Sequence, residues 1–149
     1  MMRVILDTNV LLDALLPDKE RPQGDRRNAH VLLDAITQRK VVGLLSPVVF
    51  SELVHAAKPR RADRAQVADA LEYLLDICEW TPVTAGTYCT ALASTFNDVN
   101  DAAIFFAAKR PDAIVTRDTK DFRDQVNVEV MNAGEFVRKY LSNSNPKST

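Results

Sequence analysis

The chain has 149 residues, of which 46% are hydrophobic and 26% charged, a size and balance typical of one compact domain and not of a disordered segment. Its formal net charge of −1 argues against a protein that binds nucleic acid through bulk positive charge, although a local basic rim around an acidic metal site stays open. No apolar run approaches the roughly 20 residues of a membrane span, and the apolar start meets Asp7 too early for a signal peptide. We therefore expect a cytoplasmic protein that does not associate with a membrane.

The first half of the chain predicts two strands and four helices. Val4–Leu6 is a short apolar run, as expected of a buried strand, and a carboxylate follows it directly. The segment from Asp18 to Arg27 is charged and contains Pro22 and Gly24, so we expect an exposed, mobile loop. Ser46 and Pro47 have the residue types of an N-cap and a first helical position. The expected order is a strand at 4–6, helices at 10–15 and 29–36, a strand at 41–45, and helices at 47–58 and 67–75.

The second half continues the alternation. In chain order we expect a strand at 79–83, helices at 84–96 and 97–108, strands at 113–116 and 126–131, and a helix at 133–141. The polar residues 142–149 are expected to form a flexible tail behind a single domain at 1–141. Alternating helices and strands predict an α/β domain with a mainly parallel central sheet and helices on both faces.

The two cysteines predict neither a disulfide framework nor a zinc site. Cys78 and Cys89 form no CxxC pattern and no metal-ligand grouping with His30 or His55. We expect both thiols to be reduced and mostly buried.

Acidic side chains follow two of the predicted strands. Asp7 comes directly after the first strand, and Asp118 follows Ala113–Thr116 after one arginine. Ligands bind an open parallel sheet at the carboxyl ends of its strands, so both acids should lie at that edge. Each also has an ordinary alternative as a turn residue after a strand.

Three more acids lie on predicted helices. Val48, Val49 and Ala56 are three or four residues from Glu52, which places its carboxylate on an apolar stripe where ionisation is costly without a compensating cation or hydrogen bond. A glutamate at the edge of that stripe, with its carboxylate in water, fits the spacing equally well. Asp98 and Asp101 begin a helix, where an N-cap and a first-turn acid stabilise the helix without any ligand.

Convergence of these acids would have a chemical consequence. Two carboxylates about 5 Å apart repel by roughly 3 kcal/mol at an effective dielectric constant of about 20. Several of them would either have raised pKa values or hold a divalent cation. A site of oxygen ligands alone, without histidine or thiolate, suits Mg²⁺ or Mn²⁺, which serve mainly in phosphate chemistry.

Four segments resemble, in order, the motifs of PIN-domain nucleases. They are residues 6–11, 46–53, 97–102 and 114–122, and the resemblance extends from the first strand to Phe136. It is strongest to the VapC-like toxins of bacterial and archaeal toxin–antitoxin pairs. The resemblance implies a three-layer α/β/α, Rossmann-like PIN fold. It also implies metal-dependent endoribonuclease activity that leaves 5′-phosphate and 3′-hydroxyl ends.

The resemblance also implies roles for single residues. Asp7 and Asp101 match metal ligands, Glu52 and Asp118 complete the catalytic acids, and Asp98 is an additional candidate ligand of Mg²⁺ or Mn²⁺. Thr8, Asn9 and Thr116 are candidates to hydrogen-bond the carboxylates or the attacking water, and Arg117 and Lys120 are candidates to contact RNA. Asp121 is expected in a structural turn with Phe122.

Two further basic groups are ambiguous. Arg21, Arg26 and Arg27 lie in the expected loop, and Lys58, Arg60 and Arg61 lie in a predicted turn. Either group could bind RNA phosphates if it lies near the acidic edge of the sheet. Ordinary solvated charge is the alternative for each residue.

Partners and rival functions complete the expectations. Toxins of this kind usually pair with a small antitoxin and form homodimers, so we expect both. A phosphatase that forms an aspartyl-phosphate would need an acid two residues after Asp7, where Asn9 stands, and a phosphoacceptor receiver domain would pair two acids after its first strand. A PIN-fold module that binds protein or RNA with little or no catalysis stays open as an alternative.

Overall fold

The computed structural model describes residues 1–16, 18 and 20–142, and within them five strands form one sheet in the order β3-β2-β1-β4-β5. All strand pairs are parallel, which confirms the predicted α/β class. The strands are β1 (Arg3–Leu6), β2 (Val42–Leu45), β3 (Glu79–Trp80), β4 (Ala113–Val115) and β5 (Glu129–Met131).

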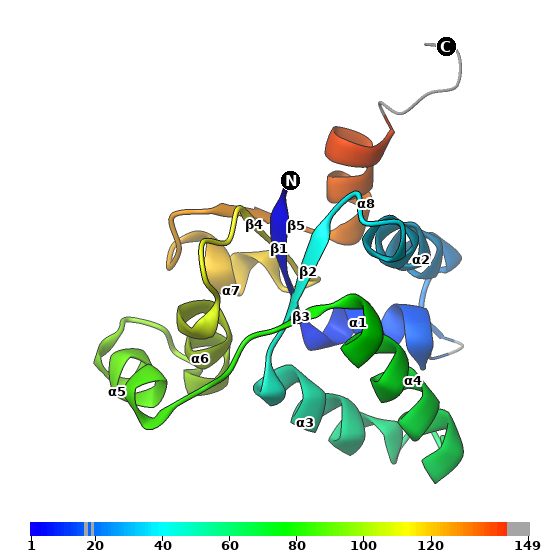
Figure 1. Ribbon diagram of the computed structural model, residues 1–149, viewed down its shortest axis with the longest axis horizontal. Coiled ribbons are helices and arrows are strands. Elements are labelled where there is room, and N and C mark those ends of the chain that lie inside the picture. The colour runs from blue at the N-terminus through cyan, green and yellow to red at the C-terminus, as the bar shows by residue number, and fades with distance from the viewer. Residues whose placement is uncertain (17, 19, 143–149) are drawn as a thin grey trace.

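Helices cover both faces of the sheet. In Figure 1, α1, α2 and α8 lie to the right of the strands, and α5, α6 and α7 lie to the left. The helices are α1 (Thr8–Leu15), α2 (Gln23–Thr37), α3 (Pro47–Ala57), α4 (Arg64–Ile77), α5 (Ala85–Ala93), α6 (Val99–Ala107), α7 (Thr119–Arg123) and α8 (Ala133–Phe136), which continues as the π-helical segment η1 (Val137–Leu141). In the described part of the chain, no helix is long and apolar enough to cross a membrane.

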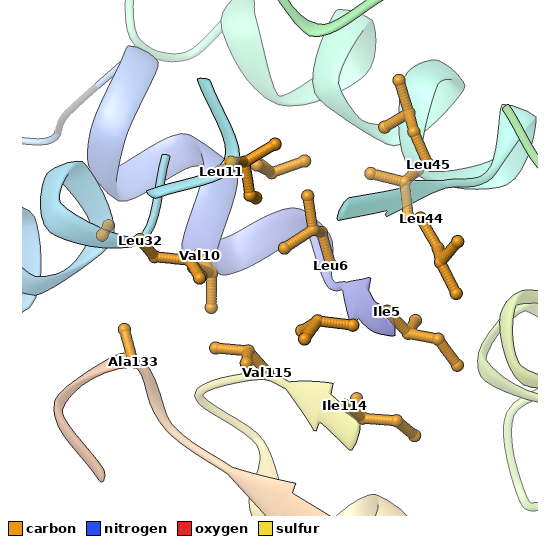
Figure 2. Close-up of a cluster of buried hydrophobic side chains, with 14 of the residues drawn as sticks. Ile5, Leu6, Val10, Leu11, Leu32, Leu44, Leu45, Ile114, Val115 and Ala133 are labelled. Carbon is orange, nitrogen blue, oxygen red and sulfur yellow. The ribbon is translucent and has the colours of Figure 1, made fainter. Parts of the chain in front are cut away.

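The core fixes where the strands end. Ile5 of β1 is in register with Leu44 of β2 and Ile114 of β4, and each of these side chains is at most 2% exposed. Figure 2 shows these three side chains on one side of the sheet, whereas Val115 of β4 points to the other side, toward Val10 of α1. Close packing of this kind tolerates little displacement, so it holds the carboxyl ends of β1 and β4 side by side.

The prediction of a loop from Asp18 to Arg27 is wrong in its second half, which is helical. Helix α2 begins at Gln23, with Pro22 as its N-cap. Asp25 lies in the first turn, where the helix dipole favours an acid, and Arg21 donates a hydrogen bond to it. This local pairing outweighs the loop signal of Pro22 and Gly24. Residues 17 and 19 lie outside the described residues.

Other elements are shorter than expected, because strand pairing and helical hydrogen bonding extend over fewer residues than the sequence patterns do. The strand expected at 79–83 ends at Trp80, before Pro82, which has no N–H to donate to a ladder. The strand expected at 126–131 begins at Glu129, and the helix expected at 84–96 ends at Ala93. The turn expected around Asp121 is the short helix α7, which buries Phe122 against Phe96.

The cysteine expectation is half wrong. Cys78 is partly buried, as expected, and burial raises the pKa of its thiol to about 12. Cys89 is exposed on α5, a helix whose only buried residue is Ala91. Of the expected tail at 142–149, only Ser142 is among the described residues.

Candidate functional site

Asp7 stands where β1 passes into α1, and it is only 6% exposed. Its backbone N–H donates to the carbonyl of Val115, which ties it to β4. The backbone N–H of Thr8 donates to its Oδ1 at 2.9 Å, and the Thr116 hydroxyl donates to its Oδ2 at 2.6 Å. Burial raises the pKa of Asp7, and the hydrogen bond from Thr116 opposes that rise. The carboxylate is therefore fixed in orientation and poorly solvated.

Glu52 lies on α3, with Val48, Val49 and Leu53 buried beside it. Its Oε1 accepts a hydrogen bond of 2.7 Å from the Thr8 hydroxyl. Burial is the main cause of its raised pKa, and the charges of Asp7 and Asp98 add to it. The Glu52 carboxylate therefore points toward Thr8 and the other acids, and it is not the fully solvated group that the alternative interpretation expected.

Asp98 and Asp101 stand at the start of α6. Asp98 is its N-cap, and its Oδ1 accepts from the backbone N–H groups of Asn100 and Asp101 at 2.8 and 3.1 Å. Asp101 is half-buried, and burial, followed by the charges of Asp7, Asp98 and Glu52, raises its pKa to about 7. The capping role that the sequence offered for Asp98 is observed, and its Oδ2 is not used in that cap.

Asp118 follows β4 and, like Asp98, is exposed. The Asn9 side chain donates to its Oδ2 at 3.0 Å and, at 3.4 Å, to Oδ2 of Asp7. The side-chain Oδ1 of Asn9 in turn accepts from the backbone N–H of Arg117 at 3.0 Å. The Thr116 hydroxyl accepts from the backbone N–H of Asp118. Asn9 and Thr116 thus link the acids that follow β1 and β4.

The acids form a cluster of negative charge, which the charge of Arg117 offsets in part at Asp7. Among the described residues, none of Asp7, Glu52, Asp98, Asp101 and Asp118 forms an ion pair with lysine or arginine. Three of them, Asp7, Glu52 and Asp101, have raised pKa values, and each is raised in part by another acid of the group. A bound cation would relieve this repulsion.

The residues fit a Mg²⁺ or Mn²⁺ ion in chemistry, although they do not form a closed cage. In the part of the chain that the structure describes, no three His, Cys, Asp or Glu side chains are grouped so that they could hold an ion by themselves. Mg²⁺ usually binds one or two carboxylates and completes its shell with water and substrate phosphate. A site of this open kind agrees with the all-oxygen donor set and the uncompensated charge.

The basic residues that the sequence analysis named differ in how near they lie to the acids. Arg117 and Arg21 line one pocket together with Asp118. Arg26 and Arg27 line a separate hollow with His30 and no acid of the group. Lys120 is exposed in α7, two residues after Asp118. Arg60, in the turn after α3, donates to the carbonyl of Ala56 in the last turn of that helix. Lys58 and Arg61 make no side-chain hydrogen bond among the described residues that ties them to the acids.

One buried charged residue was not singled out by the sequence analysis. Asp13 of α1 is 3% exposed and lies near Arg21 and Arg117. It stands three residues after Val10 and directly before Ala14, both buried. The spacing argument that marked Glu52 therefore applied to Asp13 as well, and would have found it.

Comparisons with known proteins bear on the family and the fold of the chain. A sequence profile described as PIN domain matches residues 3–120. The fold is similar to a chain in the crystal structure of VapBC2 from Rickettsia felis bound to a DNA fragment from their promoter. The TM-score is 0.60 at 19% identity, over 88% of this chain and 98% of that one. Comparison with functionally characterised proteins finds no significant match. Since the profile spans most of the sequence and all four acidic motifs begin within it, the chain belongs to the PIN-domain family.

Proposed function

We propose that the protein is a metal-dependent endoribonuclease that hydrolyses RNA phosphodiester bonds. The observation that carries the proposal is the group of acids at the carboxyl edge of the sheet, oriented by hydrogen bonds yet without any ion-paired lysine or arginine among the described residues. PIN domains are typically nucleases that depend on metal ions, and this arrangement suits that chemistry.

Asp7 and Asp101 would hold the ion most directly, and Glu52, Asp118 and Asp98 would bind it through water or complete the site. When bound, Mg²⁺ or Mn²⁺ would supply Lewis-acid stabilisation of the charge that develops on the phosphate. The Thr116 and Thr8 hydroxyls keep Asp7 and Glu52 oriented. Support of this kind fixes the direction of ligand oxygens and so improves metal affinity.

The reaction that fits is attack of water on phosphorus with departure of the 3′ oxygen. The product ends would be a 5′-phosphate and a 3′-hydroxyl. Arg117 and Lys120 flank Asp118 in sequence and would contact the phosphates of the RNA.

We further propose that the protein is the toxin of a type II toxin–antitoxin pair in the cytoplasm. The similar fold in a VapBC2 structure and the VapC-like motifs support this assignment. An antitoxin would then bind the chain and block the acidic site. A homodimer is supported by large apolar side chains exposed on α5 and α6, namely Tyr88, Leu92, Val99 and Phe106.

The test is cleavage of purified RNA by wild-type protein and by Asp7→Asn. We expect the wild type to cut RNA when Mn²⁺ is present and to stop when the ion is chelated. Asp7→Asn should lose at least about 100-fold of that activity, because it replaces a charged metal ligand by a neutral amide. Its circular dichroism spectrum should be unchanged, because asparagine has nearly the same shape as aspartate. Equal cleavage by clean Asp7→Asn protein would contradict the enzyme hypothesis. RNA binding without cleavage by the wild type would favour a binding module.

A further inference from the structure

A polar pocket of about 640 Å³ adjoins the acidic site. It lies between α1, α2 and the α8–η1 segment, and Asn9 and Asp118 form the side that it shares with the acids. Three arginines line it: Arg21 before α2, Arg117 after β4 and Arg138 in η1. We call it the arginine pocket. Three guanidinium groups from separate parts of the chain converge there.

Asp13 holds two of these arginines. Its carboxylate is 3% exposed, with Oδ2 at 3.4 Å from Nε of Arg117 and Oδ1 at 3.7 Å from Nε of Arg21. Both Nε atoms are buried and make no hydrogen bond among the described residues. A buried ion pair usually adds little net stability, because desolvation of the charges offsets their attraction. Its clearest effect here is to fix the direction of both guanidinium groups.

Arg138 is the donor that the fold leaves available. Within the described residues its guanidinium makes no hydrogen bond and no ion pair, whereas Arg21 donates to Asp25 at 2.6 Å. A Cβ on Gly134 would lie 3.3 Å from Nη1 of Arg138 and 3.1 Å from Nδ2 of Asn28. Glycine at this position therefore lets two donors come together on one wall of the pocket.

The lining of the pocket has three arginines and three aspartates, so an unpaired guanidinium, and not a net charge, is what would attract an anion. Arg21 pairs with Asp13 and Asp25, and Arg117 pairs with Asp13, which leaves Arg138 as the arginine of the pocket with no ion pair among the described residues. Arginine binds phosphate through two parallel N–H groups and is the side chain best suited to it. The pocket shares Asp118 with the acidic group, so it lies directly beside the place where a phosphate would meet the acids.

We propose that the arginine pocket binds a backbone phosphate of the RNA next to the scissile one, with Arg138 and Arg117 as donors and Asp13 as the positioning residue. The proposal rests on the proposed ribonuclease function, since it assigns a subsite to that same substrate. It also separates Arg21 and Arg117 from Arg26 and Arg27, which line another hollow.

The test is the salt dependence of RNA binding. Fluorescence anisotropy measures the affinity of Asp7→Asn protein, which should bind without cutting, for a short single-stranded RNA of mixed sequence in Mg²⁺. Adding Arg138→Gln should weaken binding several-fold and reduce the slope of log K against log salt by about 0.7, the value for one lost phosphate contact on a single strand. Arg138→Lys keeps the charge and should restore most of the slope. Arg27→Gln is the matched control and should leave the slope unchanged.

Asp13→Asn tests the positioning role through the sign of its effect. Loss of a negative charge near RNA should tighten binding if Asp13 acts only through bulk electrostatics. If Asp13 orients the arginines, the substitution weakens binding instead. Melting of the same variant by circular dichroism checks that the fold is kept.

The outcomes separate this proposal from the proposed function. An unchanged slope for Arg138→Gln, an equal change for Arg27→Gln, or tighter binding by Asp13→Asn overturns the arginine pocket even if the wild type cuts RNA. Weaker binding by Arg138→Gln and Asp13→Asn supports the pocket even if the wild type cuts no RNA. In that last case the nuclease function fails and the phosphate site stands.

Discussion

Replacing Asp101 with Asn should make the metal-free protein less sensitive to pH. The pKa of Asp101 rises from 3.8 to about 7 in the folded chain, through burial first and then through Asp7, Asp98 and Glu52. A carboxyl group with a raised pKa binds its proton more tightly in the folded state than in the unfolded chain. The stabilisation that comes from this tighter proton binding is therefore complete at pH values below 3.8, and it is lost as the pH rises from 3.8 to about 7.

The size of the effect follows from the same shift. Each tenfold change in proton affinity is about 1.4 kcal/mol, so the rise from 3.8 to about 7 sets an upper bound of about 4 kcal/mol. Solvent around this half-buried group should reduce the loss to about 1–2 kcal/mol. For a chain of this length that corresponds to a fall in Tm of about 2–8 °C.

The assay is thermal unfolding in the presence of a chelator from about pH 5 to about pH 8. The wild type should lose stability over this range, and Asp101→Asn should lose less, with the remainder due to Asp7, Asp13 and Glu52, whose pKa values are also raised. Mn²⁺ should restore the wild type at neutral pH but not Asp101→Asn. Asp69→Asn, at an exposed position of α4, is the control for charge alone. A wild type that becomes more stable as the pH rises, or an Asp101→Asn slope equal to that of the wild type, would refute the reasoning.

Three other substitutions or modifications have defined outcomes. Thr116→Val removes the hydroxyl that donates to Asp7 at 2.6 Å, and should cost about 1–3 kcal/mol in urea unfolding and weaken Mn²⁺ binding in calorimetric titration, whereas Thr116→Ser should restore both. Leu92 is the most exposed large apolar residue of α5, at 70%, and Leu92→Glu should dissociate a homodimer, as measured by light scattering. Leu75→Glu on α4 is the control and should leave the dimer intact, and a dimer that also survives Leu92→Glu would place the interface elsewhere. A thiol reagent at about pH 8 should modify Cys89 and spare Cys78, whose thiol pKa is raised to about 12; rapid labelling of both in native protein would show that Cys78 is not protected.

The fold was predictable because its strands are apolar runs and its sheet is parallel. Val4–Leu6 and Ala113–Val115 are buried on both faces, so their sequences are continuously hydrophobic. Strand polarity alone therefore predicts that Asp7 and Asp118 lie at one edge of the sheet. The start of α2 was not predictable from these patterns, because the pairing of Arg21 with Asp25 outweighs the loop signal of Pro22 and Gly24.

The site was predictable in part. The spacing around Glu52 indicated a carboxylate on an apolar stripe, but its hydrogen bond from Thr8 depends on how α1 meets α3. The apposition of Asn9 and Arg117 joins residues 108 positions apart, and no local pattern encodes it. Arg138 lies outside the four acidic motifs, and reaches the arginine pocket only because α8 and η1 pack against α2.

The chemical identity of the cut RNA ends is the most direct test of a metal-dependent nuclease built on Asp7, Glu52, Asp101 and Asp118. Purified protein is incubated with total RNA and Mn²⁺, and the ends are mapped by ligation and sequencing. The account predicts 5′-phosphate and 3′-hydroxyl ends that are absent when the ion is chelated. Ends with a 2′,3′-cyclic phosphate and a 5′-hydroxyl, formed equally well without a divalent ion, would contradict it.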